Sequence, residues 1–390
     1  MQCKDFDFIF LGAGCASLSV VMRMIESGQF THRKILILEK APKVNNDRTW
    51  CFWEEEAGFF EDIVYHQWTE LFISTDTEET IPLKMGHYRY KMIRGIDFYD
   101  ACFATIRRQK NIQITYASVS FVYTGGDISG ILVDDQPMDR GAHSIVFNSI
   151  VPRPKKHPGK FYLIQHFKGW WLESKHPIFT ASQATLMDFR LPQIEGTTFG
   201  YVLPLSATKA LIEYTLFSAG TLPPSAYDQA LRQYIEGYLG LKDYRVTEEE
   251  FGVIPMTNDR PAFFKNGLYF IGTAGGQTKA STGYTFRFIQ KQADQIVSDL
   301  IRHRRPSLAG GPAKRFRFYD STLLHILSKR QMEGKIIFSI LFKKNDAGRI
   351  FRFLDNESTF TEELKLINSL PKKVFIRAGL LEFFKMMVKI

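Results

Sequence analysis

The sequence predicts an α/β fold with three parts: a domain that begins with a β-α-β unit, an antiparallel-sheet domain interleaved with it, and a helical C-terminal region. Three observations lead to this prediction. A glycine-rich turn joins two apolar runs near the N-terminus, alternating aromatic-rich runs fill residues 160–255, and residues 301–390 mix basic with large apolar side chains. With 390 residues, 45% of them hydrophobic, the chain can bury a sizeable core.

The first element is an apolar run at 6–11, which predicts a buried strand, followed by a helical stretch to about residue 28 and a second strand at 35–38. The turn between the first strand and the helix reads Gly-x-Gly-x-x-Ser. A turn of this kind, between a strand and a helix, is typical of a Rossmann-type dinucleotide-binding domain. A glycine-rich turn that only closes the strand–helix unit is the alternative.

Each residue of this turn has a physical reason to be there. Gly12 permits the tight turn, Gly14 lets the backbone approach a pyrophosphate, and Ser17 is small enough for the helix to pack closely on the strand. The helix N-terminus would hold the phosphate charge, and Glu39 could accept hydrogen bonds from a ribose. The motif alone does not distinguish FAD from NAD.

The next elements are a helix at 97–110 and three β-rich runs at 112–117, 119–123 and 130–134. We expect these runs to form a three-stranded meander ahead of a return strand at 144–147. That order fits a large class of flavoproteins.

A hairpin is predicted from the alternating runs 199–206 and 210–217, which are joined by a short polar turn. It belongs to the expected antiparallel substrate sheet. A strand at 267–272, a glycine-rich loop to Gly283 and a helix at 284–302 then close the nucleotide domain.

The charge distribution favours a membrane surface over nucleic acid as a partner. Residues 301–390 carry 19 Lys and Arg against 8 Asp and Glu, or +11, so the other 300 residues sum to −2 of the net +9. Basic side chains mixed with large apolar ones suit an anionic lipid surface. Ordinary amphipathic helices that cover a core are the alternative, and the two interpretations are compatible.

The cysteines and the N-terminus indicate the compartment. Four cysteines lie in the first third of the chain without metal-ligand or disulfide spacing, so a reducing cytoplasm and no metal site are expected. Neither a signal peptide nor a run of about 18 uncharged apolar residues is apparent. The expected localisation is therefore cytoplasmic, at the periphery of a membrane.

Several segments, in order along most of the chain, resemble the lycopene cyclase family. The most specific is 201–215, which is similar to the L-P-L-S-x-T-x-x-L-I-E-D-T segment of the bacterial cyclases. The full series is 47–53 (DRTWCFW), 165–170 (QHFKGW), 187–190 (MDFR), 201–215 (YVLPLSATKALIEYT), 252–256 (GVIPM) and 281–284 (STGY).

The resemblance implies that the nucleotide domain binds FAD, in its reduced form and without net redox turnover, with NAD(P)H as the expected electron donor. It also implies a domain division: 1–58, 92–155 and 256–305 for FAD, 59–91 and 156–255 for the substrate sheet, and 306–390 for the basic helical region. The FAD site is expected to comprise Gly12, Gly14, Ser17, Glu39, Arg48, Gly272, Thr273, Gly275, Thr282 and Gly283.

The implied substrate is lycopene or a related linear carotene, whose ends become β-rings. Ring closure needs an acid, a base and stabilisation of a carbocation. Glu213 is the candidate acid, since it alternates with apolar residues on a strand and burial would raise its pKa; a surface carboxylate is the alternative reading. Whether Glu213 or the flavin donates the proton stays open. The proposed pocket walls are Trp50, Phe52, Phe167 and Trp170.

Two positions depart from the family pattern. Tyr214 stands where an acidic residue usually follows the matched glutamate, and Lys279 begins a segment that replaces the usual His-Pro before Thr-Gly-Tyr. Glu213 is thus the only carboxylate in its motif.

Two other functions compete with cyclisation. A flavin-dependent lipid oxidoreductase, such as a hydroxylase or a prenyl reductase, would share the nucleotide domain and a sheet-built pocket, but it would turn over its flavin. A non-enzymatic escort of prenyl lipids would not need flavin chemistry at all.

Overall fold

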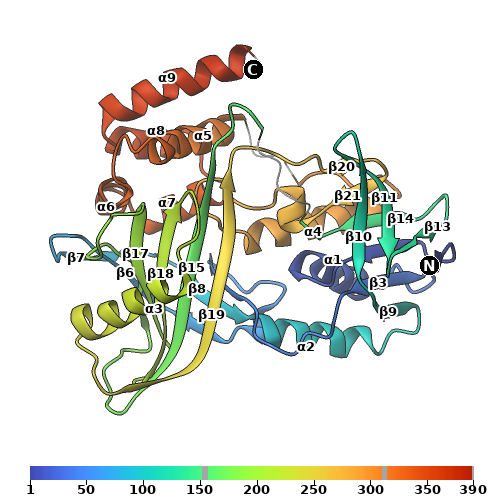
Figure 1. Ribbon diagram of the computed structural model, residues 1–390, viewed down its shortest axis with the longest axis horizontal. Helices are drawn as coiled ribbons and strands as arrows, with labels where there is room; N and C mark the ends of the chain where they lie inside the picture. Colours follow the sequence, from blue (N-terminus) through green and yellow to red (C-terminus); the bar gives the residue numbers. More distant parts are fainter. Residues whose placement is uncertain (152–156, 310–313, 389–390) are drawn as a thin grey trace.

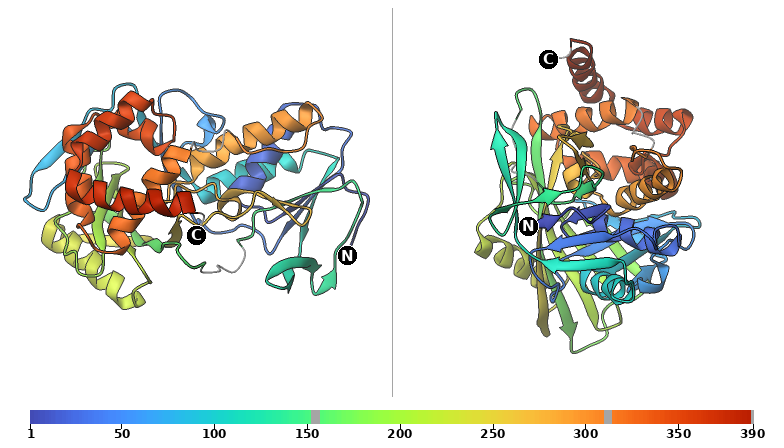
Figure 2. Two further views of the ribbon diagram at one scale, coloured as in Figure 1. Left: turned by 90° about the horizontal axis from the view of Figure 1, so that it is seen from above. Right: turned by 90° about the vertical axis from the view of Figure 1, so that its right-hand side faces the viewer.

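The computed structural model describes residues 1–151, 157–309 and 314–388. Two sheets lie side by side: a mainly parallel sheet near the N-terminus, and a larger sheet with the C-terminal helices above it (Figures 1 and 2).

The N-terminal β-α-β unit lies at the centre of the smaller, six-stranded sheet. Its apolar side chains alternate between two covered faces: Phe8 and Phe10 pack toward helices, while Ile9 and Leu11 pack toward a small antiparallel sheet. Coverage on both faces explains why the strands are continuously apolar. Across the sheet the strands are β20 (Phe264–Lys265), β21 (Leu268–Phe270), β14 (Ile145–Asn148), β2 (Phe8–Leu11), β3 (Ile35–Glu39) and β9 (Ile112–Tyr116).

The helices on one face are α1 (Cys15–Glu26), α2 (Gly95–Ile106) and α4 (Phe286–Ile301). The antiparallel sheet on the other face consists of β10 (Val119–Thr124), β11 (Asp127–Val133) and β12 (Gln136–Pro137). A short parallel pair, β1 (Gln2–Cys3) and β13 (Asp139–Arg140), lies beside them.

The predicted meander is corrected by the structure. Its expected first strand, β9, instead pairs in parallel with β3, with Ile35 opposite Ile112, and forms the edge of the parallel sheet. The third strand of the meander is β12. The expected return strand is β14.

The larger sheet has seven strands, which are antiparallel except for the pair β16 and β6. The predicted hairpin forms its centre, where the chain turns between β17 and β18 through a bond from Leu205 N–H to the carbonyl of Lys209 at 2.8 Å. In order the strands are β19 (Tyr244–Thr257), β15 (Tyr162–Ser174), β18 (Lys209–Ser218), β17 (Thr197–Pro204), β16 (Gln183–Asp188), β6 (Glu70–Ser74) and β7 (Thr80–Leu83).

Each face of the larger sheet has its own cover. Helix α3 (Pro224–Gln233) and the π-helical turn after it pack on one face. The other face packs against the C-terminal helices and the small sheet β4 (Thr49–Glu54), β8 (Arg89–Arg94) and β5 (His66–Trp68). The C-terminal helices are α5 (Lys314–Ser328), α6 (Gly334–Lys344), α7 (Ala347–Leu354), α8 (Phe360–Ser369) and α9 (Lys372–Val388).

In the described ranges, none of the helices combines the length and the apolar character needed to cross a bilayer.

Candidate active site

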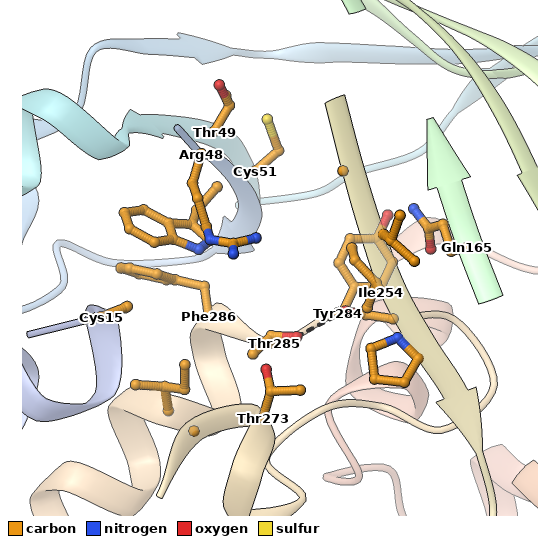
Figure 3. A pocket seen from close by; sticks show the side chains of 18 of the residues that line it. Cys15, Arg48, Thr49, Cys51, Gln165, Ile254, Thr273, Tyr284, Thr285 and Phe286 are labelled. Atoms are coloured by element: carbon orange, nitrogen blue, oxygen red, sulfur yellow. Dashed lines mark hydrogen bonds between the residues drawn. The ribbon is translucent and has the colours of Figure 1, made fainter. Parts of the chain in front are cut away.

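A cavity of about 720 Å³ joins the two sheets. One part is lined by the glycine-rich turn after β2, and another by the face of the large sheet that meets the C-terminal helices. Figure 3 shows the region between them, where Arg48, Thr273 and Gln165 come from three different segments of the chain. The cavity is therefore built by both domains.

Helix α1 presents a free N-terminus to this cavity. Its N-cap residue, Gly14, makes no side-chain capping bond, and the first turn carries no acidic residue. A Cβ at position 14 would meet no atom within 4 Å, so there is open space beside this backbone. Gly12 has a φ of +88°, and a Cβ there would come within 2.7 Å of the Ser149 hydroxyl oxygen. Uncapped N–H groups with room beside them form an anion site.

Glu39 lies at the end of β3 and lines the cavity. Its carboxylate accepts a hydrogen bond from Ala13 N–H at 2.6 Å, which fixes the glycine-rich turn to the neighbouring strand. Exposed Arg48 also lines the cavity. Ser17, in contrast, is fully buried in α1 and donates a hydrogen bond to Ser149 at 3.1 Å, so its position is one of packing.

The loop after β21 approaches α1 closely. Gly272 has a φ of +63°, and a Cβ there would lie 2.9 Å from the Cβ of Ala16. Thr273, Thr282 and Gly283 line the cavity together with Gly272. Gly275 does not line it; a side chain there would overlap the carbonyl oxygen of Phe270.

Two buried polar atoms in this part of the cavity lack a partner among the described residues. They are Oε1 of Gln165 and Oγ1 of Thr282. Both residues line the cavity, and Gln165 borders Gly283 so closely that a Cβ there would come within 2.7 Å of its Oε1. Because unpaired buried polar atoms are costly, these two indicate a place for a polar ligand.

Glu213 lies on β18, on the strand face that it shares with Leu211 and Phe217, and it lines the cavity. Its side chain is 8% exposed. Burial raises the pKa of the Glu213 carboxyl well above its usual value, and the charge of Glu250 raises it further. Both effects favour the protonated, uncharged form of this carboxyl.

The sequence reasoning missed Glu250, the neighbour of Glu213 in the cavity. It lies on β19, where it accepts a hydrogen bond from the Thr49 hydroxyl at 2.6 Å. The pKa of the Glu250 carboxyl is raised, because burial outweighs the hydrogen bonds from Thr49, Glu213 and Trp171, which lower it. The available signal was the acidic run at 248–250, in which alternation directs the middle glutamate to the face opposite its two neighbours.

Gly169 explains how the two carboxyls meet. In the register of β18, β15 and β19, Glu213 and Glu250 both lie opposite Gly169 on the strand between them. A Cβ at position 169 would lie 3.1 Å from Cγ of Glu213 and 2.9 Å from Cγ of Glu250. The glycine leaves the space through which the side chains reach each other.

Two buried tyrosines, Tyr90 and Tyr201, and the partly buried Tyr284 also line the cavity and were not anticipated. The hydroxyls of Tyr90 and Tyr201 share a hydrogen bond. Burial raises the pKa of all three phenols, so they remain neutral. They contribute aromatic surface without adding charge.

Two of the four predicted pocket walls lie at the cavity. Trp50 and Phe167 line the cavity. Phe52 lies one layer behind, with its ring 4.4 Å from that of the lining residue Phe286. The prediction for Trp170 is wrong, because its side chain packs with Ile212 on the opposite face of the sheet, beneath α3.

The two departures from the family pattern lie outside this acid pair. Tyr214 points to the α3 face, where its ring lies 6.5 Å from that of Tyr227. An acid at that position would therefore not face the cavity. Lys279 is buried and forms an ion pair with Asp320 at 3.0 Å, which connects its loop to α5.

The parallel nucleotide domain, the antiparallel sheet and the cavity between them define the class: an α/β protein with the fold of FAD-dependent enzymes. Solved structures share that fold. A geranylgeranyl bacteriochlorophyll reductase-like protein from Thermoplasma acidophilum has a TM-score of 0.61 at 13% identity, over 97% of this chain and 99% of that one. A flavin-dependent brominase has a TM-score of 0.63 at 10% identity, over 94% and 97%.

Sequence comparison places the chain more narrowly. The protein belongs to the lycopene cyclase protein family, whose model matches residues 7–378. A lycopene beta-cyclase from Pantoea ananas is 24% identical over 386 residues, which cover 94% of this chain and 95% of that protein. A chloroplastic neoxanthin synthase from Solanum lycopersicum is 25% identical over 304 residues, or 72% of this chain and 57% of that protein.

Proposed function

We propose that this protein is a lycopene beta-cyclase, an isomerase that closes the linear ends of lycopene, or of a related linear carotene, into β-ionone rings. The observation that carries the proposal is the buried acid Glu213 in a cavity that is both aromatic and close to a nucleotide-type turn. The name of the Pantoea ananas relative supports the choice of reaction.

The residues around the glycine-rich turn fit FAD. Gly12 and Gly14 would admit the pyrophosphate at the N-terminus of α1, and Glu39 would accept hydrogen bonds from the ribose. The unpaired Oε1 of Gln165 and Oγ1 of Thr282 would form hydrogen bonds with the ligand. Reduced FAD would supply an electron-rich ring that stabilises a nearby cation, with NAD(P)H as the proposed electron donor.

The chain's own residues account for the proton chemistry. Glu213 gives its proton to the terminal C=C bond of the polyene, and a tertiary cation forms. A neighbouring double bond attacks this cation and closes the six-membered ring, after which a ring carbon loses a proton to a carboxylate. One proton enters and one leaves, so the product is an isomer of the substrate. The rings of Phe167 and Tyr201 offer π faces to the cation.

We also propose that α9 rests on a lipid surface, from which an apolar polyene would enter. One side of α9 packs on α5 through the buried pair His325 and Glu382 at 2.7 Å. Seven of its apolar side chains are 44% to 69% exposed: Ile376, Leu380, Leu381, Phe383, Phe384, Met386 and Met387. Exposed Lys372, Lys373 and Arg377 on the same helix complement anionic headgroups.

The test is expression in a lycopene-accumulating bacterium, with extracted pigments separated by chromatography. We expect cyclic carotenes from the wild type and at least a hundredfold less from Glu213→Gln, because loss of a general acid typically costs 10²–10⁴-fold. Glu173→Gln, on the same sheet but paired at the surface with Arg245, is the matched control and should remain active.

Unchanged lycopene in cells that contain folded, flavin-loaded wild type would contradict the proposal. It would favour a flavin-dependent oxidoreductase, which consumes reduced flavin for each product.

A further inference from the structure

We propose that Glu250 is a positioning residue for the proposed cyclisation, which holds one shared proton on Glu213 and recovers that proton at the end of each cycle. Glu213 and Glu250 are called the carboxyl pair below. This inference rests on the proposed function and extends it to a residue outside the motif that contains Glu213.

The first argument is geometric. Three adjacent strands bring Glu213, Gly169 and Glu250 into one row, and both carboxyl groups line the cavity. They approach over a residue without a side chain, beside the Cδ1 methyl group of Leu211. Like-charged carboxyls at contact distance cannot both ionise at neutral pH, and such pairs share a proton.

The second argument locates the proton. Oε2 of Glu250 already accepts the Thr49 hydroxyl at 2.6 Å, while Oε1 is buried and has no partner of good geometry among the described side chains. A proton on Glu213 supplies the missing donor. Among the described side chains, the hydrogen bond that would stabilise a charged Glu213 is a weak one, from the Thr215 hydroxyl at 3.5 Å. Glu250 therefore holds the charge and Glu213 the proton.

The third argument follows from charge balance during the reaction. When Glu213 protonates the polyene, the carboxyl pair becomes doubly negative while the substrate carries one positive charge. The two carboxylates then stabilise the cation in a buried site, where electrostatic interactions are strong. When the ring then loses a proton to the carboxyl pair, the pair again holds one proton. Each catalytic cycle therefore needs no acid from solvent.

The test compares Glu250→Gln with Glu249→Gln, its matched control. Glu249 precedes Glu250, is 54% exposed and pairs with Lys168 at 2.9 Å outside the cavity. The readout is the infrared C=O band of the protonated Glu213, identified by its loss in Glu213→Gln and followed against pH in the purified, flavin-loaded protein.

We expect Glu250→Gln to lower the pH midpoint of this band by about one unit or more, because the neighbouring negative charge is gone. In cyclisation assays the alkaline limb of the pH–rate profile should move down by the same amount, and Glu250→Asp should restore part of the shift. Glu249→Gln should change neither.

An unshifted band in a folded Glu250→Gln protein would overturn the shared proton. The infrared result decides this even if the wild type fails to cyclise lycopene, an outcome that would instead contradict the proposed function.

Discussion

The missing side chain of Gly169 shapes the acid site as much as the groups around it. The close approach of Glu213 and Glu250 depends on this one empty position in β15. The role of Gly169 thus depends on its partners in the neighbouring strands and cannot be inferred from the residues next to it in the sequence.

Gly169→Ala tests this role. The added Cβ would lie 2.9–3.1 Å from Glu250, Leu211 and Glu213, so the two carboxyls must move apart. We expect cyclisation to fall at least about tenfold, with a loss of unfolding free energy of about 1–3 kcal/mol from overpacking. Gly220→Ala, where a Cβ meets no atom within 4 Å, is the control and should keep wild-type activity. Full activity of Gly169→Ala would show that the close approach is unnecessary.

At the residue scale the sequence singled out one of the two glutamates that line the cavity beside Gly169. Glu213 could be identified because it interrupts an apolar strand within a distinctive segment. Trp170 was misplaced because two adjacent tryptophans, Trp170 and Trp171, point to opposite faces, and the strand register alone decides which face is which. Glu250 was missed because its position opposite Gly169 depends on pairing between strands far apart in sequence.

At the scale of elements, α1 begins without a side-chain cap, as do α2, α3, α4, α6 and α7, and its N-cap glycine has open space beside it in the cavity. Most helices gain stability from an Asp, Asn, Ser or Thr at this position. A glycine there leaves N–H groups free for a phosphate, so binding and helix stability make opposite demands on residue 14.

Gly14→Asp and Gly14→Asn separate these demands. Both side chains can cap α1, so both proteins should unfold at or above the wild-type temperature without flavin. Only Asp places a negative charge where a pyrophosphate would lie, and we expect its FAD affinity to be about tenfold or more below that of Gly14→Asn. Equal affinities, measured by flavin fluorescence titration, would argue against a phosphate at this helix end.

Elements with local signals were predicted well, and those defined by distant pairing were not. The β-α-β unit, the hairpin of β17 and β18, and α4 follow from periodicity and turn residues. The misassigned strand β9 has the same alternating pattern as a meander strand, and only its pairing with β3 places it in the parallel sheet.

At the scale of the whole molecule, the exposed apolar side of α9 predicts where the protein meets a membrane. Replacing Leu380, Phe383 and Phe384 with serine removes apolar surface but no charge. We expect this triple variant to bind anionic lipid vesicles at least about tenfold more weakly than the wild type, in a sedimentation assay. Binding of the wild type should weaken as salt is raised.

Ile194→Ser with Phe264→Ser is the control, since both side chains are at least half exposed and neither belongs to α9. Equal binding by the triple variant and this control would place the lipid contact elsewhere.

The chain order of the parallel sheet has a consequence for how the protein is made. A ribosome releases the glycine-rich turn first, yet β21, Gly272 and α4 follow only after the whole seven-stranded sheet. Until then α1 lacks its partner α4, to which Arg23 and Asp294 connect it, and β14 has an unpaired edge. Pairing over such long sequence separations slows folding and leaves apolar surface exposed in the nascent chain. A fragment that ends before β21 lacks Gly272, Thr273, Thr282 and Gly283, so it cannot contain the complete proposed nucleotide site.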